Sequence, residues 1–104
     1  MDASGLARGP ARSGAGMTKA QLFLRNQASV LLALSRGAAG WGAILQLTDL
    51  SDSAFGRVMA HLVAERMIEV SAGPGGARRY EIAPAGLDWI FAHADEARGL
   101  GVGK

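Results

Sequence analysis

Apolar residues in the first half of the chain recur three and four positions apart, a spacing that is typical of amphipathic helices. Thr18 is a good N-cap and Gly37 a good helix stop, which predicts a first helix from Thr18 to about Ser35. A second helix is expected over residues 41–48 and a third over residues 52–64, joined by a tight connection. Their predicted inward residues are Trp41, Ile44, Leu45 and Thr48 in the second helix, and Phe55, Val58, Met59 and Leu62 in the third.

The period of the apolar pattern changes after the third helix. Ile68 and Val70 alternate with polar neighbours, and so do Tyr80 and Ile82, as in two antiparallel strands. The sequence between them, SAGPGGA, is rich in turn-forming residues and predicts the loop of a hairpin. Pro84 then favours the start of a last helix. One face of that helix is predicted to carry Leu87, Ile90, Phe91 and Ala94.

The first helix has a wide apolar surface made of two neighbouring stripes. One stripe consists of Phe23, Gln27, Val30 and Leu34, and the other of Leu24, Ala28, Leu31 and Leu32. One stripe suffices to cover the core of a small domain. The second therefore predicts contact with another surface, most economically that of a second copy of the chain. The alternative is a first helix that is buried on both sides within one chain.

Two aromatic residues of the last helix, Trp89 and His93, lie on the side opposite its apolar face. A large aromatic residue on this side predicts a contact surface. Alternatively, the last helix packs against the first helix with both faces, and Trp89 belongs to the core. The expected dimer interface consists of Leu24, Leu31, Leu32, Trp89 and His93.

Composition narrows the class of protein. The chain has 104 residues, 49% of them hydrophobic, which fits one domain with a small core. It contains no cysteine, so it has no disulfide or thiolate metal site and suits a reducing compartment. No apolar stretch approaches the length of a membrane span, and the first residues lack the apolar core of a signal peptide. We therefore expect a cytoplasmic protein without membrane contact.

Charge is unevenly distributed along the chain. The net charge is +2, yet residues 17–98 hold eight basic and eight acidic side chains, which cancel. Residues 1–16 are rich in glycine and include Arg8 and Arg12, which predicts a flexible basic arm. The predicted domain is 17–98, and residues 99–104 are expected to form a flexible tail. Because the charges of the domain balance, DNA binding would depend on the placement of a few arginines.

The chain offers few groups for catalysis. It has two histidines, His61 and His93, and no spacing that is typical of metal ligands. The GPGG stretch is not followed by the Lys-Ser/Thr of a phosphate-binding loop, and it fits a hairpin turn better. We therefore expect neither an enzyme nor a cofactor.

The order helix, helix, helix, strand, strand, helix resembles that of the winged helix-turn-helix domain. The stretch LSDSAFGRVMAHLVAERMIEV, residues 50–70, is similar to the turn, recognition helix and first wing strand of that family. RRYEIAPAGLDWI, residues 78–90, is similar to its second wing strand and following helix. The resemblance covers residues 18–97 and points to small prokaryotic regulators of MarR, ArsR and PadR type. The predicted fold class is thus mostly α with a small β-hairpin wing (α+β), in the order α-α-α-β-β-α.

This resemblance implies double-stranded DNA as the partner. The third helix would enter the major groove, and the wing would contact the adjacent backbone or minor groove. Arg57 is the strongest candidate for a DNA contact, because an outward arginine can grip a guanine or a phosphate. The full set of residues expected at the DNA is Ser51, Ser53, Ala54, Arg57 and His61 on the helix, with Arg78 and Arg79 beside the wing loop.

The favoured function is that of a dimeric transcriptional regulator that binds specific DNA sequences. The alternative is a winged-helix module that binds another protein and not DNA. The lysine-free wing, the balanced charge and the small residues Ala54, Gly56 and Ala60 favour the alternative. Arg57 and the basic arm favour DNA. The sequence carries no signature of a pocket for a small-molecule effector.

Overall fold

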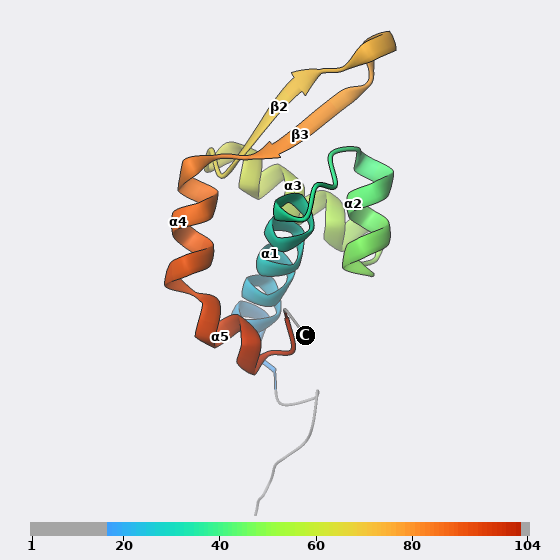
Figure 1. Cartoon of the computed structure of the whole chain (residues 1–104). Coiled ribbons are helices and arrows are strands. Elements are labelled where there is room, and N and C mark those ends of the chain that lie inside the picture. The colour runs from blue at the N-terminus through green and yellow to red at the C-terminus, as the bar shows by residue number, and fades with distance from the viewer. Residues whose placement is uncertain (1–16, 103–104) are drawn as a thin grey trace, which may run out of the picture.

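The structure, a computed structural model, describes residues 17–102, so the predicted arm at 1–16 and residues 103–104 lie outside the described part. Three helices precede a two-stranded antiparallel hairpin and further helices follow it, which is the winged helix-turn-helix fold predicted from the sequence. In Figure 1 the hairpin projects above the helices, with α2 on one side of α1 and with α4 and α5 on the other. The elements are α1 (Lys19–Ser35), α2 (Trp41–Thr48), α3 (Asp52–Ala64), β2 (Ile68–Ala72), the 3-10 turn η2 (Pro74–Gly76), β3 (Arg78–Ile82), α4 (Pro84–Ala92) and α5 (Ala94–Gly99).

Helix α1 begins and ends where local signals predict. The Thr18 Oγ1 accepts a hydrogen bond from the N–H of Gln21 at 3.1 Å, and the Thr18 N–H donates to Gln21 Oε1 at 3.0 Å. This capping box satisfies two N–H groups at the start of the helix. At the other end Gly37 has a φ of 101°, a left-handed conformation that favours glycine and stops the helix. The predicted N-cap and stop are therefore confirmed.

The main core lies between α1, α2, α3 and the hairpin. All the predicted inward residues of α3 are buried, and so are Ile44 and Thr48 of α2. Trp41 departs from the prediction, since 44% of its surface is exposed. Its ring stands edge-on to Phe55, with centroids 4.7 Å apart, and at a tilt to Tyr80 at 6.0 Å. As the first residue of α2, Trp41 covers the edge of the core beside the hairpin instead of entering it.

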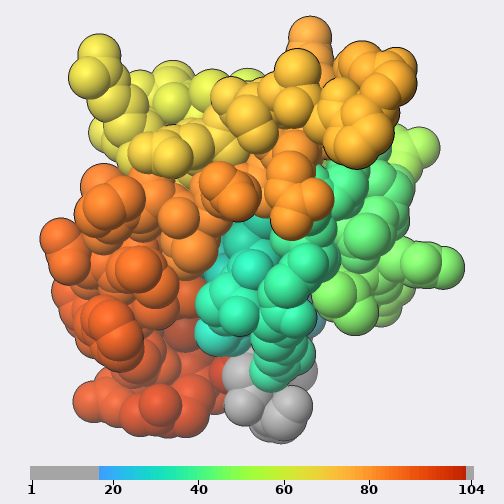
Figure 2. Space-filling view, turned by 45° about the horizontal axis from the view of Figure 1, so that its top comes forward, coloured from blue at the N-terminus to red at the C-terminus, as the bar shows by residue number. Residues whose placement is uncertain are grey.

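Strand β3 joins the wing to the body of the domain. It pairs with β2 in antiparallel register, with Val70 opposite Tyr80. Tyr80 is buried, and its N–H donates to the carbonyl oxygen of Ala39 at 2.8 Å, in the connection between α1 and α2. At the tip, Gly75 has a φ of 70°, so the turn uses a conformation that favours glycine. Figure 2 shows the hairpin, in yellow and orange, beside the teal and green residues of α1 and α2.

The last helical segment differs from the prediction in two ways. It is broken at His93 into α4 and α5, and only part of the predicted inward face packs against the body, since Ile90 contacts the main core as predicted but Leu87 and Phe91 do not. Of the predicted inward residues, Leu87 is 39% exposed and Phe91 is 77% exposed. Trp89, predicted on the outer side, packs against both apolar clusters of the domain. Helix α4 is therefore turned so that Phe91, and not Trp89, faces outward.

Gly86 explains this orientation, because it lets α4 approach α1 closely. A Cβ atom at this position would collide with the carbonyl oxygen of Met67. It would also lie 3.0 Å from Ile82 Cγ1 and 3.2 Å from Leu31 Cδ2. Any side chain would thus push α4 away from the hairpin and from α1. Apolar patterning does not detect this face, because glycine does not count as an apolar residue.

Residues of the same chain cover both stripes of α1. This agrees with the alternative to a dimer interface, in which the first helix is buried on both sides within one chain. Leu31 lies in the main core and has no exposed surface. It cannot contact a second copy, and the predicted dimer interface is wrong on this residue. The rest of the second stripe, Leu24, Ala28 and Leu32, lies under α5 and the residues that follow it. The buried cluster there consists of Ala28, Ala97 and Val102, bordered by Leu24, Leu32 and Trp89.

The body of the domain extends beyond the predicted boundary at residue 98. Helix α5 ends at Gly99, and the N–H of Val102 donates to the carbonyl oxygen of Ala97 at 3.0 Å. Val102 is buried against Ala28. The predicted tail at 99–104 is therefore corrected, because its described residues 99–102 fold back on α1.

We expect Gly86→Ala to lower the free energy of unfolding by about 1–3 kcal/mol, the usual cost of overpacking. Gly42→Ala is the matched control, because Gly42 lies within α2 and a Cβ atom there would meet nothing within 4 Å. Alanine forms helices better than glycine, so Gly42→Ala should raise stability by up to about 1 kcal/mol. Urea unfolding followed by circular dichroism measures both changes. Equal effects of the two substitutions would contradict the close approach of α4.

Candidate nucleic-acid interface

A tight turn fixes the start of α3. Asp49 ends α2 in the left-handed conformation with a φ of 57°, which aspartate tolerates better than most residues. Ser51 then caps α3, and its Oγ accepts a hydrogen bond from the N–H of Ala54 at 3.2 Å. Ser53, two residues further on, is exposed, and its hydroxyl forms no hydrogen bond with residues 17–102. The cap thus uses the Ser51 hydroxyl, while Ser53 remains at the surface beside a helix start that favours anions.

The outward face of α3 is defined by its buried face. Because Phe55, Val58, Met59 and Leu62 point inward, Ser53 and Arg57 lie on the opposite side. Arg57 is exposed and forms no ion pair within residues 17–102. Its guanidinium can therefore donate hydrogen bonds to an external anion or to the edge of a base.

A hollow that we name the α1–α3 groove adjoins one flank of Arg57. It has a volume of about 390 Å³. Lys19, in the first turn of α1, lies across this groove from α3 and adds a second cation to the surface that holds Arg57. Ala54 lines the groove instead of standing on the outward face. The lining residues are Lys19, Leu22, Phe23, Asn26, Ala54, Arg57 and Val58.

A second hollow, the α3–wing groove, lies on the other flank of α3 and has a volume of about 420 Å³. Its lining is mostly apolar, and Arg78 is the only charged residue among the described residues that line it. Val63 and Val70 are exposed on its two walls. The lining residues are Trp41, Gly56, Met59, Ala60, Val63, Ala64, Val70, Arg78 and Tyr80.

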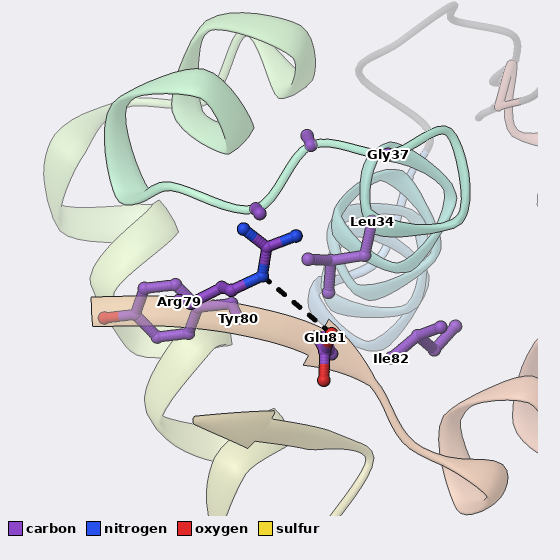
Figure 3. Close-up of a pocket in the computed structure, with 8 residues that line it drawn as sticks. Leu34, Gly37, Arg79, Tyr80, Glu81 and Ile82 are labelled. Carbon is purple, nitrogen blue, oxygen red and sulfur yellow. Dashed lines mark ion pairs between the residues drawn. The ribbon is translucent and has the colours of Figure 1, made fainter. Parts of the chain in front are cut away.

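The two wing arginines lie on opposite faces of the hairpin, because successive residues of a strand alternate. Arg78 faces α3 across the α3–wing groove. Arg79 lies on the other face, and its Nε is 3.9 Å from Glu81 Oε2. Figure 3 shows Arg79 and Glu81 beside Leu34, in a separate hollow of about 420 Å³ next to the connection between α1 and α2. Of the two wing arginines, only Arg78 shares a surface with α3.

Both histidines contact neighbouring aromatic rings of the same chain. His61 is half-buried, and its ring stands edge-on to Phe23 of α1, with centroids 5.0 Å apart. His93 stacks on Trp89 at 4.3 Å, and its Nδ1 donates to the carbonyl oxygen of Trp89 at 2.8 Å. His61 lies one helical turn after Arg57, and its contact with Phe23 brings that end of the outward face of α3 against α1. His93 supports the end of α4.

The charged groups that line the two grooves beside α3 are the hydrogen-bond donors Lys19, Arg57 and Arg78. Among residues 17–102, no three His, Asp or Glu side chains come together in a way that could hold a metal ion. In the same part of the chain, no helix combines the length and the apolar character needed to cross a membrane. The chemistry available beside α3 is the binding of anions and polar edges by arginine, lysine and hydroxyl groups.

Two residues of the α1–α3 groove, Lys19 and Asn26, do not stand out in the sequence. Lys19 is an ordinary charged residue of a first helical turn, and its place opposite Arg57 depends on how α1 and α3 pack. Asn26 stands in the polar run Arg25-Asn26-Gln27, so nothing in the sequence indicates that it is buried beside α3.

No protein-family model and no curated protein matches the chain. Among solved structures, the crystal structure of a probable transcriptional regulator from Pseudomonas aeruginosa is similar, with a TM-score of 0.62 and 24% sequence identity. The similarity covers 83% of this chain and 62% of that protein, so this chain spans less than two-thirds of its length. This likeness supports the winged-helix fold.

Proposed function

We propose that this chain is a transcriptional regulator that binds double-stranded DNA, with α3 in the major groove and the wing on the adjacent backbone or minor groove. The observation that carries the proposal is Arg57, exposed on the face of α3 opposite its buried residues. A helix of this kind fits the major groove and can contact base edges there. The similar solved structure is described as that of a probable transcriptional regulator, which supports this proposal.

The finer assignments rest on the sequence resemblance. We infer a regulator of MarR, ArsR or PadR type that acts in the cytoplasm by binding, without catalysis. The similarity between residues 50–70 and the turn, recognition helix and first wing strand of such regulators supports this assignment. Residues 78–90, which run from β3 into α4, support it as well.

We assign different roles to the candidate residues according to where they lie. Arg57 reads a guanine with two parallel hydrogen bonds or holds a phosphate. Ser53 at the start of α3 and Lys19 across the α1–α3 groove hold phosphates, which position the helix without reading sequence. Arg78 contacts the backbone from the wing. Arg79 lies near Glu81 on the other face, and we assign it no DNA contact.

We propose that the regulator binds DNA as a homodimer. The charges of residues 17–98 balance, so one copy offers few phosphate contacts and two copies on adjacent half-sites double them. The outer face of α4 offers an apolar surface for this contact, because Leu87 and Phe91 are exposed there. This surface replaces the one expected from α1, where the second stripe is covered by α5.

A protein-binding module is the second candidate, and the α3–wing groove favours it. Trp41, Val63 and Val70 expose apolar surface around this groove, and Arg78 is the charged residue at its edge. An apolar side chain of a partner protein would fit such a groove better than the polar edges of DNA bases. The two candidates differ in the residue on which they depend, because DNA binding requires Arg57 and this groove does not include it.

Arg57→Ala should weaken binding to a duplex selected from a random DNA library by about 1–3 kcal/mol, because it removes a contact with a base or phosphate. The same change should alter the free energy of unfolding by no more than about 0.5 kcal/mol, since Arg57 is exposed. Fluorescence anisotropy and urea unfolding measure the two effects. Relaxed specificity would indicate that Arg57 reads a base, and an even loss across sequences would indicate a phosphate contact.

Arg79→Ala is the matched control, because it removes the same charge from the other face of the wing. We expect it to leave DNA affinity almost unchanged. If Arg57→Ala and Arg79→Ala weakened DNA binding equally, net charge and not the docking of α3 would explain the affinity. Absence of DNA binding by the unsubstituted protein would contradict the proposal and leave the protein-binding module.

Phe91→Ser should convert a two-chain particle into a monomer at micromolar concentration, as measured by sedimentation. Phe91 is exposed in the single chain, so the substitution should not unfold it. Leu47→Ser is the control, because Leu47 is an exposed apolar residue on α2, away from α4. A monomeric unsubstituted protein, or a dimer that survives Phe91→Ser, would rule out the α4 interface.

A further inference from the structure

The chain enters the domain beside the outward face of α3. Residues 1–16 precede Met17, and Lys19 in the first turn of α1 lines the α1–α3 groove together with Arg57 of α3. The α3–wing groove lies on the other flank of α3. In Figure 1 the start of α1, in blue, lies at the end of the domain away from the hairpin. The N-terminal segment, residues 1–16, and the wing therefore join the domain on opposite flanks of α3.

The N-terminal segment offers cations and almost no apolar surface. Its charged residues are Arg8 and Arg12 against the single acid Asp2. Leu6 is the only large aliphatic residue between positions 2 and 16. A segment of this composition buries too little apolar surface to offset the entropy of ordering it against the body of the domain. Its binding energy must therefore come from its two arginines.

The surface where this segment joins α1 is cationic as well. Lys19 and Arg57 are exposed, and neither forms an ion pair within residues 17–102. No described residue that lines the α1–α3 groove is acidic. Arginines of the N-terminal segment are thus repelled by the groove beside them, and together with its two cations they attract an external anion.

Arg12 has the reach to contact the groove next to the one that α3 occupies in the proposed complex. It lies five residues before Met17. An extended chain of this length spans about 17 Å. The centre of the neighbouring minor groove lies half a helical turn away, which is also about 17 Å along the DNA axis. The three residues between Arg8 and Arg12 have small side chains, which suits a minor groove about 6 Å wide.

We propose that Arg8 and Arg12 insert into the minor groove beside the major groove that α3 occupies, on the side away from the wing. This inference rests on the proposed function, because α3 determines where the chain meets the DNA. An A·T-rich run has a narrow minor groove with a strong negative potential, which attracts arginine. The amino group of guanine projects into the same groove and obstructs it. The chain therefore prefers DNA with A·T pairs about half a helical turn from the pairs that α3 contacts.

Base substitution in the duplex distinguishes the two grooves. The full chain first selects a duplex from a random library, and its A·T run beside the α3 site is then replaced by G·C or by inosine·C pairs. Inosine resembles guanine in the major groove but lacks the amino group in the minor groove. By fluorescence anisotropy, we expect G·C to weaken binding by about tenfold and inosine·C to stay within about twofold of A·T. Equal losses with both replacements would indicate a major-groove contact and would overturn the proposal.

Substitution of the two arginines gives the residue-level test. Arg8→Gln with Arg12→Gln should abolish the preference for A·T over G·C. It should also make the salt slope shallower by about 1.8 per copy, since each lost contact accounts for about 0.9. The matched control, Arg36→Gln with Arg98→Gln, removes the same charge from exposed residues that line a hollow between α1, α4 and α5. This control should keep the preference.

The outcomes separate this inference from the proposed function. A preference for A·T that survives Arg8→Gln with Arg12→Gln, or that the control also loses, would overturn the insertion. So would a lower melting temperature of the Arg8→Gln, Arg12→Gln chain without DNA, because the arginines would then bind the body of the domain. DNA binding that depends on Arg57 but not on Arg8 and Arg12 would leave the proposed function alone in place. Absence of binding to any duplex would refute the proposed function and the insertion with it.

Discussion

Helix α1 is enclosed from opposite sides by the rest of the chain, and the other elements depend on this enclosure. Leu31 lies in the main core with α2, α3 and the hairpin, while Ala28 lies in the second cluster under α5. Helix α4 can close over α1 because Gly86 has no side chain to collide with Met67 and Leu31. In a close-packed interior, α1 cannot rotate or slide without opening both clusters. The enclosure therefore fixes the positions of α3 and of the wing.

The surface proposed to bind DNA follows from this fixed frame. Helix α3 buries one face against the core and must turn Arg57 outward. The hydrogen bond from Tyr80 to Ala39 holds β3 against the body, so Arg78 faces α3 and Arg79 faces away. The part of α1 that is not enclosed completes the α1–α3 groove with Lys19 and Asn26. The guanidinium of Arg57 thus borders both the proposed DNA surface and the α1–α3 groove.

The sequence predicted what depends on local signals and missed what depends on close contacts. The capping residues and the helical period of the apolar residues predict the three helices before the hairpin, and the alternating period predicts its two strands. The inward face of α4 is predicted only in part: Ile90 packs against the core as expected, whereas Leu87 and Phe91 are exposed, because Gly86 and not an apolar residue marks the close contact with α1. The different roles of Arg78 and Arg79 depend on strand register. The groove beside Lys19 depends on two helices that are distant in the chain.

The central claim is that α3 and the wing bind DNA through a few placed cations, and the salt dependence of duplex binding tests it most directly. Each neutralised phosphate releases counterions, so the logarithm of the binding constant falls linearly with the logarithm of salt concentration. With Lys19, Arg57 and Arg78 at phosphates, these three cations alone should give a slope of about −2.7 for one copy and about −5.4 for two copies. A slope near zero, or no binding at low salt, would contradict the claim.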